Sequence, residues 1–159
     1  LDRETSGLII YAKGKSIQKK MMQEFKQKRV KKKYIAFVQG PLSKKQGEIK
    51  NSIEGLSAIT KYKVIEKRKD FSVVEVQPLT GRTNQIRIHF KQIGHPILGE
   101  TKFAFRRDFK IKAKRLCLHA KNLEFIHPIR KKMVFFSCEL PSGMKELLER
   151  NQPIRLSPT

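Results

Sequence analysis

Residues 78–90 read PLTGRTNQIRIHF, and within this stretch the sequence changes from a strand pattern to a helix pattern. The β-branched run from Ser72 to Val76 leads into it, and Pro78 and Gly81 interrupt the extended chain. Thr83 then provides a hydroxyl N-cap before residues of helical period. The sequence therefore predicts a strand that stops here and a helix that begins after Thr83.

The predicted helix has an apolar face and a basic face. Three apolar residues recur at helical spacing, namely Ile86, Phe90 and Ile93. Gly94 follows at the position where a glycine commonly ends a helix. Arg87 and Lys91 lie one turn apart on the other face, and Arg87 is also close to the free N–H groups of the first turn, which favour anions. We therefore expect Arg87 to serve a negatively charged group.

Aspartate is rare in this chain, so the acidic partner can be sought among few candidates. The sequence holds Asp2, Asp70 and Asp108 and no other aspartate. The last two lie in polar turns, where a solvated turn role is sufficient. Asp2 instead precedes a tight polar turn and the apolar run 8–12, which we predict to be a strand. A side chain at such a junction has a rigid support, so Asp2 is the candidate functional acid.

Five motifs follow one another along nearly the whole chain. They are LDRETSG at 1–7, KYIAFVQG at 33–40, TGRTNQIRIH at 80–89, GHPILG at 94–99 and RLCLHA at 115–120. In content and order they resemble the RluA-like RNA pseudouridine synthases. Members of that family usually have His where this chain has Asn84, and they begin ahead of Leu1 with a Lys-Pro-containing strand and a His-Arg pair. The resemblance therefore implies one catalytic domain over residues 1–159 that lacks its usual N-terminal portion.

The resemblance also implies a fold and a reaction. The expected fold is α+β: a bent, mostly antiparallel mixed sheet with flanking helices and loops, and RNA in the central cleft. The family converts uridine to pseudouridine without a cofactor, by breaking the bond from ribose to the uracil nitrogen and rejoining the turned base through carbon 5. The motif match assigns the catalytic aspartate to Asp2, its arginine partner to Arg87 and the active-site tyrosine to Tyr34, whose hydroxyl is a candidate acid or base.

Five other residues are expected near the RNA. Four of them should grip phosphate or brace the loop, and the fifth resembles an apolar wall of the uracil pocket: Arg82, Thr83, Gln85 and His89, and then Leu118. Simpler interpretations stay open for the site. Asp2 can cap a turn, Arg87 can lie on a helix surface, Tyr34 can be an ordinary strand residue, and Leu118 can belong to the core.

The charge of the chain indicates a polyanionic partner. Thirty-six Lys and Arg residues face fourteen Asp and Glu, which gives a formal net charge of +22. Membrane binding would also use positive charge, but the sequence has no long apolar segment and no basic amphipathic helix with aromatic anchors. Nucleic acid is therefore the expected partner, and we expect a monomer with neither a membrane nor an obligate protein partner.

The two cysteines, Cys117 and Cys138, lie in apolar, strand-like stretches and form no Cys-x-x-Cys pair. They are predicted to be buried free thiols in a reducing compartment, which favours a cytoplasmic location. The four histidines and these cysteines have no structural-zinc spacing, so no metal site is predicted.

Periodicity predicts the remaining elements. Ser16 is the expected N-cap of an amphipathic helix that reaches Lys28. Strands are expected at 34–38, at 58–66 and 71–77 as a hairpin, and at 116–120, 123–126 and 133–138, with a closing helix at 142–151. The loop 101–114 interleaves phenylalanines with basic residues, which either stack on RNA bases or anchor the loop to the core.

Three functions are compatible with these patterns. The leading hypothesis is an RNA pseudouridine synthase that acts on ribosomal or transfer RNA through Asp2, Tyr34 and Arg87. The alternative is a non-catalytic RNA-binding module, or an inactive fragment that keeps the fold without the reaction. A third, a ribosomal protein, is suggested by the charge alone. Formation of pseudouridine by the purified chain separates the first hypothesis from the other two.

Overall fold

Strand β2 lies near the centre of a seven-stranded sheet in the computed structural model, which describes residues 1–154. The strands are β1 (Ser6–Gly7), β2 (Lys31–Gln39), β3 (Gln46–Ile49), β4 (Thr60–Lys67), β5 (Phe71–Pro78), β6 (Leu118–Ile126) and β7 (Met133–Ser137). They are arranged in the order β1-β6-β2-β5-β4-β3, and β7 pairs with β6. Among the described strands β1 and β6 form the one parallel pair, so the predicted α+β fold with a mostly antiparallel mixed sheet is confirmed.

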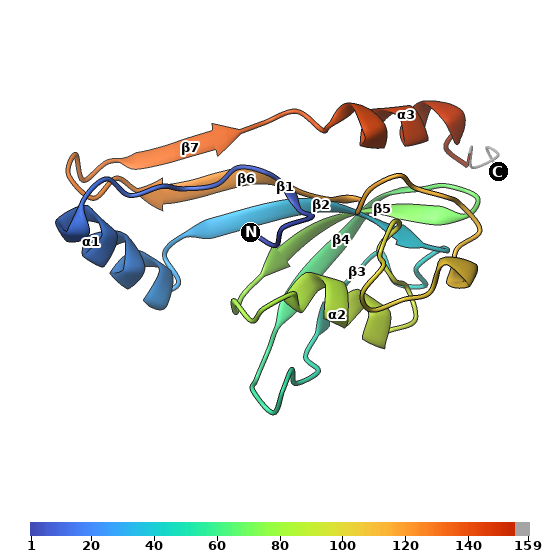
Figure 1. Ribbon diagram of the computed structural model, residues 1–159, viewed down its shortest axis with the longest axis horizontal. Coiled ribbons are helices and arrows are strands. Elements are labelled where there is room, and N and C mark those ends of the chain that lie inside the picture. Colours follow the sequence, from blue (N-terminus) through green and yellow to red (C-terminus); the bar gives the residue numbers. More distant parts are fainter. Residues whose placement is uncertain (155–159) are drawn as a thin grey trace.

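Three helices flank this sheet (Figure 1). They are α1 (Lys15–Lys26), α2 (Gln85–Gln92) and α3 (Ser142–Arg150), and a short 3₁₀ helix, η1 (Arg106–Asp108), interrupts the loop before β6. In Figure 1, α1 and α3 lie towards opposite ends of the molecule, and α2 lies between them on the lower side of the sheet. The predicted hairpin is present as β4 and β5.

The main core forms where β2 crosses the middle of the sheet. Residues 34–38 are all buried, which requires cover on both faces because neighbouring strand residues point in opposite directions. Phe90 of α2 and Met144 of α3 belong to this core and are completely buried. A smaller cluster forms under α1, where Met21 packs with Phe125 of β6. The predicted apolar faces of all three helices therefore contribute to packing.

The N-terminal segment differs from its prediction. The run 8–12 is not a strand, and only Ser6 and Gly7 pair with β6, opposite His119 and Ala120. Leu8 continues this contact with one backbone hydrogen bond to Ala120, of 3.0 Å, before the chain turns towards α1. Apolar residues of the run, among them Leu8, instead pack against the smaller core cluster. Leu8 and Ile10 are thus partly buried, whereas Ile9 and Tyr11 are exposed (53% and 84%), and the burial that exists comes from packing against this cluster and not from strand pairing.

Two predicted helix starts are also corrected. Gly14 stands at the N-cap of α1, in place of Ser16, and Asn84 stands at the N-cap of α2, in place of Thr83. Asn84 adopts a left-handed conformation with φ 55° and makes no side-chain capping bond. The loop before α2 is fastened by Gln85, whose side-chain oxygen accepts hydrogen bonds from Thr80 Oγ1 (2.6 Å) and the Arg82 N–H (3.1 Å). The side chain of Gln85, which belongs to the helix, therefore fixes the loop at the helix start, a role that was expected of Thr83.

Two smaller expectations have a mixed outcome. Gly94, with φ 81°, directly follows the C-cap of α2, as predicted. The two strands expected at 116–120 and 123–126 are one continuous strand, β6, because Asn122 between them pairs with Lys33 of β2 and with Ser137 of β7. The closing helix α3 lies within its predicted range.

Gly7 offers a test of how the N-terminal segment is held. Its φ is +115°, and an added Cβ would lie 2.3 Å from the carbonyl oxygen of Ala120. We expect Gly7→Ala to lower the free energy of unfolding by more than the roughly 1–3 kcal/mol that a strained backbone conformation alone costs, because β1 must also move away from β6. Urea denaturation measures the loss.

Gly14→Ala is the matched control for this prediction. Gly14 also has a positive φ, +87°, but an added Cβ would meet no atom within 4 Å. This variant should therefore show the cost of backbone strain without the steric contact. Equal losses of stability in the two variants would contradict a tight β1–β6 approach.

Candidate active site

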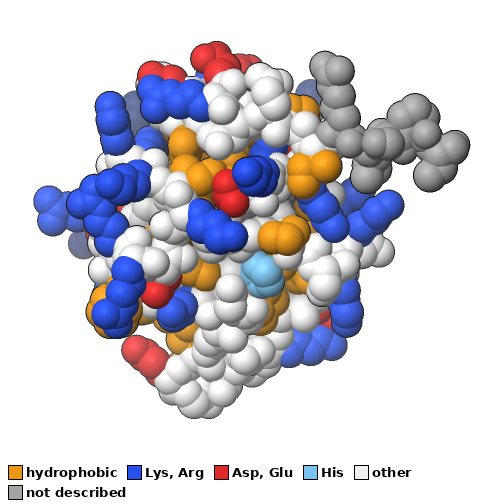
Figure 2. All heavy atoms as spheres, turned by 90° about the vertical axis from the view of Figure 1, so that its right-hand side faces the viewer, with side chains coloured by type: hydrophobic (Ala, Val, Ile, Leu, Met, Phe, Trp, Pro, Cys, Tyr) orange, Lys and Arg blue, Asp and Glu red, His pale blue; other side chains and the backbone are white. Residues whose placement is uncertain are grey.

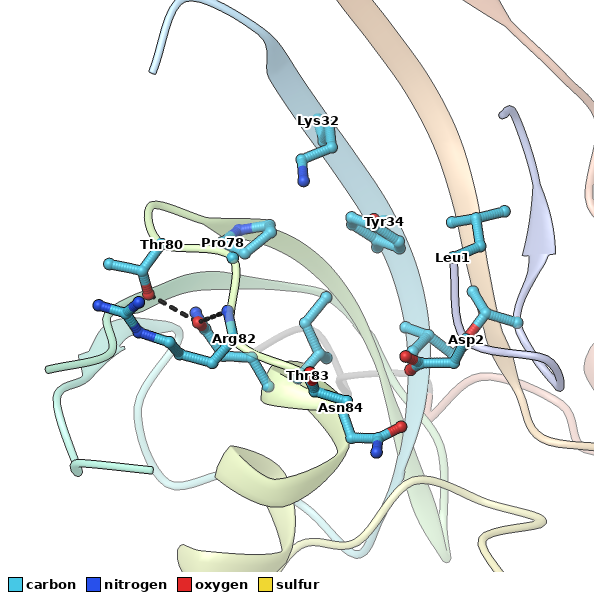
Figure 3. A pocket seen from close by; sticks show the side chains of 14 residues that line it. Leu1, Asp2, Lys32, Tyr34, Pro78, Thr80, Arg82, Thr83 and Asn84 are labelled. Atoms are coloured by element: carbon cyan, nitrogen blue, oxygen red, sulfur yellow. Dashed lines mark hydrogen bonds between the residues drawn. The ribbon is translucent and has the colours of Figure 1, made fainter. Parts of the chain in front are cut away.

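A cavity of about 330 Å³ opens between the N-terminal segment, β2 and the start of α2. Figure 3 shows Asp2 from the N-terminal segment, Lys32 and Tyr34 from β2, and Thr83 and Asn84 from the loop before α2 around this space. The other lining residues are Leu1, Thr5, Pro78, Thr80, Gly81, Arg82, Gln85, Ile86 and Leu118. Its size is in the range of small-ligand sites. Segments that are far apart in the sequence thus meet around one hollow.

The guanidinium of Arg87 lies behind this cavity and meets three carboxyl groups. Two hydrogen bonds of 2.8 and 2.7 Å join it to Glu100, and a third of 3.0 Å joins Nη1 to Glu4. The Oδ2 atom of Asp2 is 4.0 Å from the same Nη1. Arg87 is only 2% exposed, which excludes the simpler interpretation that it merely lies on a helix surface. The structure does bring Asp2 and Arg87 together, as the sequence predicts.

Glu100 was not identified from the sequence, although it is the main partner of Arg87. Its side chain is completely buried, and its Oε1 atom also accepts the backbone N–H groups of Thr101 (3.0 Å) and Lys102 (2.9 Å). A sequence signal did exist, because Glu100 is the one acidic residue between Glu75 and Asp108. The rarity of aspartate that selected Asp2 does not extend to glutamate, so only this local isolation marks Glu100. Glu4, which is half exposed, carries no such signal.

The ionisation of the Arg87–Glu100 pair follows from these contacts. Burial raises the pKa of the Glu100 carboxyl, but hydrogen bonds from Arg87 and from backbone N–H groups outweigh burial, so the pKa lies below its ordinary value of 4.5. The hydrogen bond to Glu100 in turn raises the pKa of Arg87. Because the carboxyl pKa is lowered on folding, its contribution to stability is present above pH 4.5 and is lost as the pH falls further through the folded-state value.

Tyr34 lines the cavity next to this cluster and is 9% exposed. Burial and, as the smaller cause, the negative charge of Asp2 together raise the pKa of its hydroxyl to about 12. The hydroxyl therefore stays protonated at neutral pH and can donate a proton or a hydrogen bond. Of the two predicted roles, acid or base, the resting state of Tyr34 favours the acid.

Replacing Tyr34 by Phe should remove a proton-transfer step and leave the ring in place. We expect turnover of RNA to fall by roughly 10²–10⁴-fold, the usual contribution of one general acid or base, with little change in the unfolding midpoint. The alkaline absorbance titration of wild type minus Tyr34→Phe should show one tyrosine ionising near pH 12. A difference titration near pH 10, the ordinary value, would show that the hydroxyl is solvated and would contradict the burial argument.

Four more of the predicted residues can now be placed. Arg82 and Thr83 line the cavity, and the Arg82 side chain donates to the Ser57 carbonyl over 2.9 Å. Gln85 is buried, and its amide NH₂ group donates to the Ile59 carbonyl at 3.0 Å. Leu118 lines the cavity and is 2% exposed, so it forms a wall and belongs to the core at once.

His89 lies in the interior, away from the cavity. Its two ring nitrogens are 2.8 Å from Thr60 Oγ1 and 2.8 Å from the Asn51 carbonyl oxygen, and it is completely buried. Burial lowers the pKa of the imidazole, which keeps the ring neutral. A contact with RNA phosphate is therefore closed to His89. Gln85 does line the cavity, but its amide NH₂ group already donates to the Ile59 carbonyl and to Thr60 Oγ1. Bracing of the loop is the predicted role that their geometry leaves.

The cysteines are free, as predicted, but only one is buried. Burial raises the pKa of the Cys117 thiol to about 12. Cys138 is half-buried, with Sγ 3.2 Å from His119 Nε2. Within residues 1–154 no group of three or more His, Cys, Asp or Glu side chains is arranged to hold a metal ion. No helix in the same range is both long and apolar enough to span a membrane.

The phenylalanines of loop 101–114 divide between the two predicted roles. Phe103 is half-buried, and the Arg87 guanidinium carbon lies 5.4 Å from its ring centroid, so this ring anchors the loop over the cluster. Phe105 is 66% exposed, and Arg107 lies 4.9 Å from its ring centroid. Figure 2, which turns the right-hand side of Figure 1 to the viewer, shows Lys and Arg side chains spread over that face with few acidic ones. Positive charge is thus not confined to the cavity.

Comparison with known proteins identifies the family of this chain. Residues 1–92, more than half of it, match the family model described as RNA pseudouridylate synthase. The chain belongs to the RNA pseudouridylate synthase family. The matched region includes Asp2, Tyr34 and Arg87, and the resemblance to RluA-like synthases that the five motifs carried is confirmed by relatives along the full chain.

Three relatives illustrate the extent of this similarity. The dual-specificity RNA pseudouridine synthase RluA of Vibrio cholerae is 32% identical over 99% of this chain and 71% of its own length. The uncharacterised RNA pseudouridine synthase YlyB of Bacillus subtilis is 37% identical over 94% of this chain and 53% of its own. The ribosomal large subunit pseudouridine synthase C of Buchnera aphidicola is 34% identical over 94% of this chain and 54% of its own. The chain thus spans about half the length of several curated relatives that it matches.

Solved structures of pseudouridylate synthase domains have the same fold. The human RNA pseudouridylate synthase domain containing 1 superposes with a TM-score of 0.83 and 26% identity, over 100% of this chain and 74% of its own. The human domain containing 4 superposes with a TM-score of 0.72 and 22% identity, over 86% of this chain and 68% of its own, and this supports the fold alone. The bent sheet that the resemblance implied is therefore the sheet of this family.

Proposed function

We propose that this protein is an RNA pseudouridine synthase that isomerises a specific uridine in ribosomal or transfer RNA. One observation carries the proposal. The Asp2 carboxylate lies 4.0 Å from the buried Arg87 guanidinium, at the edge of a cavity that Tyr34 also lines. Membership of the family supports the reaction class, and the net charge of +22 supports a polyanionic substrate.

Each of the three residues has a role in the proposed reaction. The bond between ribose C1′ and uracil N1 breaks, a bond between C1′ and C5 forms, and the proton on C5 leaves while N1 gains one. Asp2 supplies the carboxylate that attacks the sugar or the base or assists the deprotonation, and Arg87, which lies 4.0 Å away, orients that carboxylate. Tyr34 faces the uracil ring and, being protonated at neutral pH, donates a proton or hydrogen bond during the exchange.

The target uridine has to leave its stack to reach this cavity. The reacting atoms of a stacked base are covered, so the substrate is a loop nucleotide or one that is extruded from a helix. Ribosomal and transfer RNA are proposed as substrates because the names of the relatives refer to the ribosomal large subunit and to dual specificity. The free thiols of Cys117 and Cys138 support a proposed location in a reducing compartment such as the cytoplasm, and we propose a monomer without an obligate partner.

The decisive experiment is direct. The purified chain is incubated with deproteinised ribosomal and transfer RNA that lack pseudouridine, and carbodiimide-based mapping then locates new sites. The proposal expects conversion at one or a few positions, and no conversion in RNA kept without protein. A complete absence of product in both RNA classes, with the RNA demonstrably bound, would refute it.

A second function is favoured by one feature of the cluster. Arg87 hydrogen-bonds Glu100 and Glu4 at 2.7–3.0 Å, whereas Asp2 is 4.0 Å away, so the guanidinium is engaged mostly with groups other than the acid it should serve. A non-catalytic RNA-binding module that keeps the cleft would have this arrangement. It predicts salt-sensitive binding, with log K falling by about 0.7 per log unit of salt for each phosphate contacted on a single strand, and no product.

A further inference from the structure

A second hollow adjoins the catalytic cavity. It has a volume of about 630 Å³ and shares Lys32, Pro78, Thr80, Gly81 and Arg82 with the cavity that holds Asp2 and Tyr34. One wall is formed by the C-terminal end of α1 and the turn into β2, and the other by the end of β5 and the loop that follows it. We call this hollow the α1 groove. It continues the catalytic cavity outward along the surface.

The α1 groove is basic throughout. Its charged lining residues are Lys26, Lys28, Lys31, Lys32 and Arg82, and no acidic side chain lines it. Lys31 pairs with Glu124 at 3.4 Å, but within residues 1–154 the other four take part in no ion pair. Within residues 1–154 most other lysines also lack a carboxylate partner, so what distinguishes the groove is that these four cations line one hollow beside the catalytic cavity. Its unmatched charge suits a chain of phosphates.

Lys32 stands at the junction of the two hollows. It projects from β2 beside Tyr34 and Pro78 (Figure 3), and its ammonium nitrogen lies 5.4 Å from the ring centroid of Phe25. Burial lowers the pKa of this lysine. The Lys32 ammonium is half-buried and faces a ring, but within residues 1–154 it has no carboxylate partner. An anionic group of a ligand in the groove can take that place.

Phe25 provides the apolar part of the same groove. Its side chain is 42% exposed and lines both the α1 groove and a neighbouring hollow. The Lys32 ammonium lies against its ring. An exposed ring beside several cations is the combination that single-stranded nucleic acid uses, with bases stacked on the ring and phosphates on the cations. An acidic peptide would use the cations but would have less use for the ring.

We propose that the single-stranded RNA next to the target uridine leaves the catalytic cavity over Lys32 and runs along the α1 groove. Lys26, Lys28, Lys32 and Arg82 contact its phosphates, and a base adjoining the target stacks on Phe25. This inference rests on the proposed function, since it names the path of that substrate. Several nucleotides beside the target are then recognised by the α1 groove, in addition to the uridine in the catalytic cavity.

The phosphate contacts are tested with a charge-matched pair of variants. The first variant replaces two groove lysines, one at the end of α1 and one just after it (Lys26→Gln with Lys28→Gln). The control replaces two exposed lysines of α1 that line no described hollow (Lys19→Gln with Lys20→Gln). Fluorescence anisotropy measures the binding of oligouridylates of about 4 and about 12 nucleotides, the span of single-strand sites. The groove variant should lose roughly 25-fold in affinity for the longer probe near 0.1 M salt, and its salt slope should fall by about 1.4.

Stacking is tested separately. Phe25→Leu should weaken binding of the longer oligouridylate by roughly tenfold, and Phe25→Tyr should restore it, because a stacking ring can be replaced by another ring but not by an aliphatic chain. The control is Phe135→Leu on β7, which is also exposed (61%) but lies outside the groove. A purely structural role for Phe25 would appear as a fall in the unfolding midpoint of Phe25→Leu that accompanies its loss of affinity.

The outcomes separate this inference from the proposed function. If wild-type protein converts uridine in ribosomal or transfer RNA but the groove and control variants bind the longer probe equally, the groove assignment is overturned and the enzyme stands. If wild type makes no pseudouridine while the groove variant alone loses binding, the catalytic proposal fails and the groove stands as an RNA surface. Binding that polyglutamate displaces as readily as oligouridylate would overturn the choice of RNA as the occupant.

Discussion

Asp2→Asn should abolish isomerisation, with a loss of at least about a thousandfold in turnover, while RNA affinity stays within about twofold of wild type. The amide has the shape of the carboxylate but can neither attack nor accept a proton in the same way. The fold should survive, because Arg87 keeps its hydrogen bonds to Glu100 and Glu4. Pseudouridine mapping measures the turnover, and anisotropy with the same RNA measures the affinity.

Asp70→Asn is the matched control for this prediction. It makes the same chemical change in the turn between β4 and β5, where Asp70 is 4.0 Å from Lys110 and lines no described cavity. It should retain wild-type turnover. If Asp2→Asn also turned over at the wild-type rate, the assignment of Asp2 as the catalytic acid would be wrong, whatever the family of the chain.

Arg87→Met should cause the largest loss of stability of the variants considered, about 3–5 kcal/mol in the free energy of unfolding. The variant leaves Glu100 as a buried carboxylate without its cation, since that side chain is completely inaccessible. Removal of one partner from a buried ion pair costs more than the pair contributes, because the remaining charge is neither solvated nor paired. Urea denaturation at neutral pH measures the change.

A double-mutant cycle gives this prediction its control. Glu100→Gln in the Arg87→Met background should recover part of the loss, because the glutamine is uncharged yet can still accept the N–H groups of the following loop. Additive losses would show that the two residues act independently. The exposed pair Arg150–Glu146 supplies the comparison for a surface contact, where Arg150→Met should change stability by less than about 0.5 kcal/mol.

The sequence predicted best the features that depend on a local pattern of residues, such as a hairpin or the apolar stripe of a helix. The β4–β5 hairpin is present, and the predicted stripe of α2 supplies Ile86 and Phe90 to the core. The meeting of Asp2 with Arg87 came from a different source, the order of five motifs, since no periodicity joins residues so far apart in the chain. Local chemistry selected Asp2 among the three aspartates and Arg87 as a residue that serves an anion, but it did not pair the two.

The errors have a shared physical cause, which is tertiary contact that overrides local preference. Thr83 has the side chain of an N-cap, but Gln85 reaches back to Thr80 and Arg82, and this fixes the turn in another way. The run 8–12 has the composition of a strand, but β6 is already paired along most of its length with β2 and β7. Only two residues of the N-terminal segment therefore find a free edge.

Glu100 illustrates a further limit of pattern reading. Acidic residues are usually solvated, so a single glutamate after an apolar run is expected on the surface. Its burial becomes favourable only when Arg87 and the N–H groups of the following turn converge on it, which requires the finished fold. The same convergence explains why Arg87 is buried although it lies on the helix face away from the apolar stripe.

The cluster around Arg87 also sets the direction in which a nucleotide can approach. One guanidinium is shared by three acidic side chains, of which Asp2 lines the cavity, so this cluster holds more acidic than basic groups within a strongly basic protein. We expect a phosphate to be disfavoured beside these carboxylates and favoured near Lys32 and Arg82, whereas a neutral pyrimidine meets neither effect. The proposed RNA substrate should therefore enter the cavity with a base ahead of its phosphates.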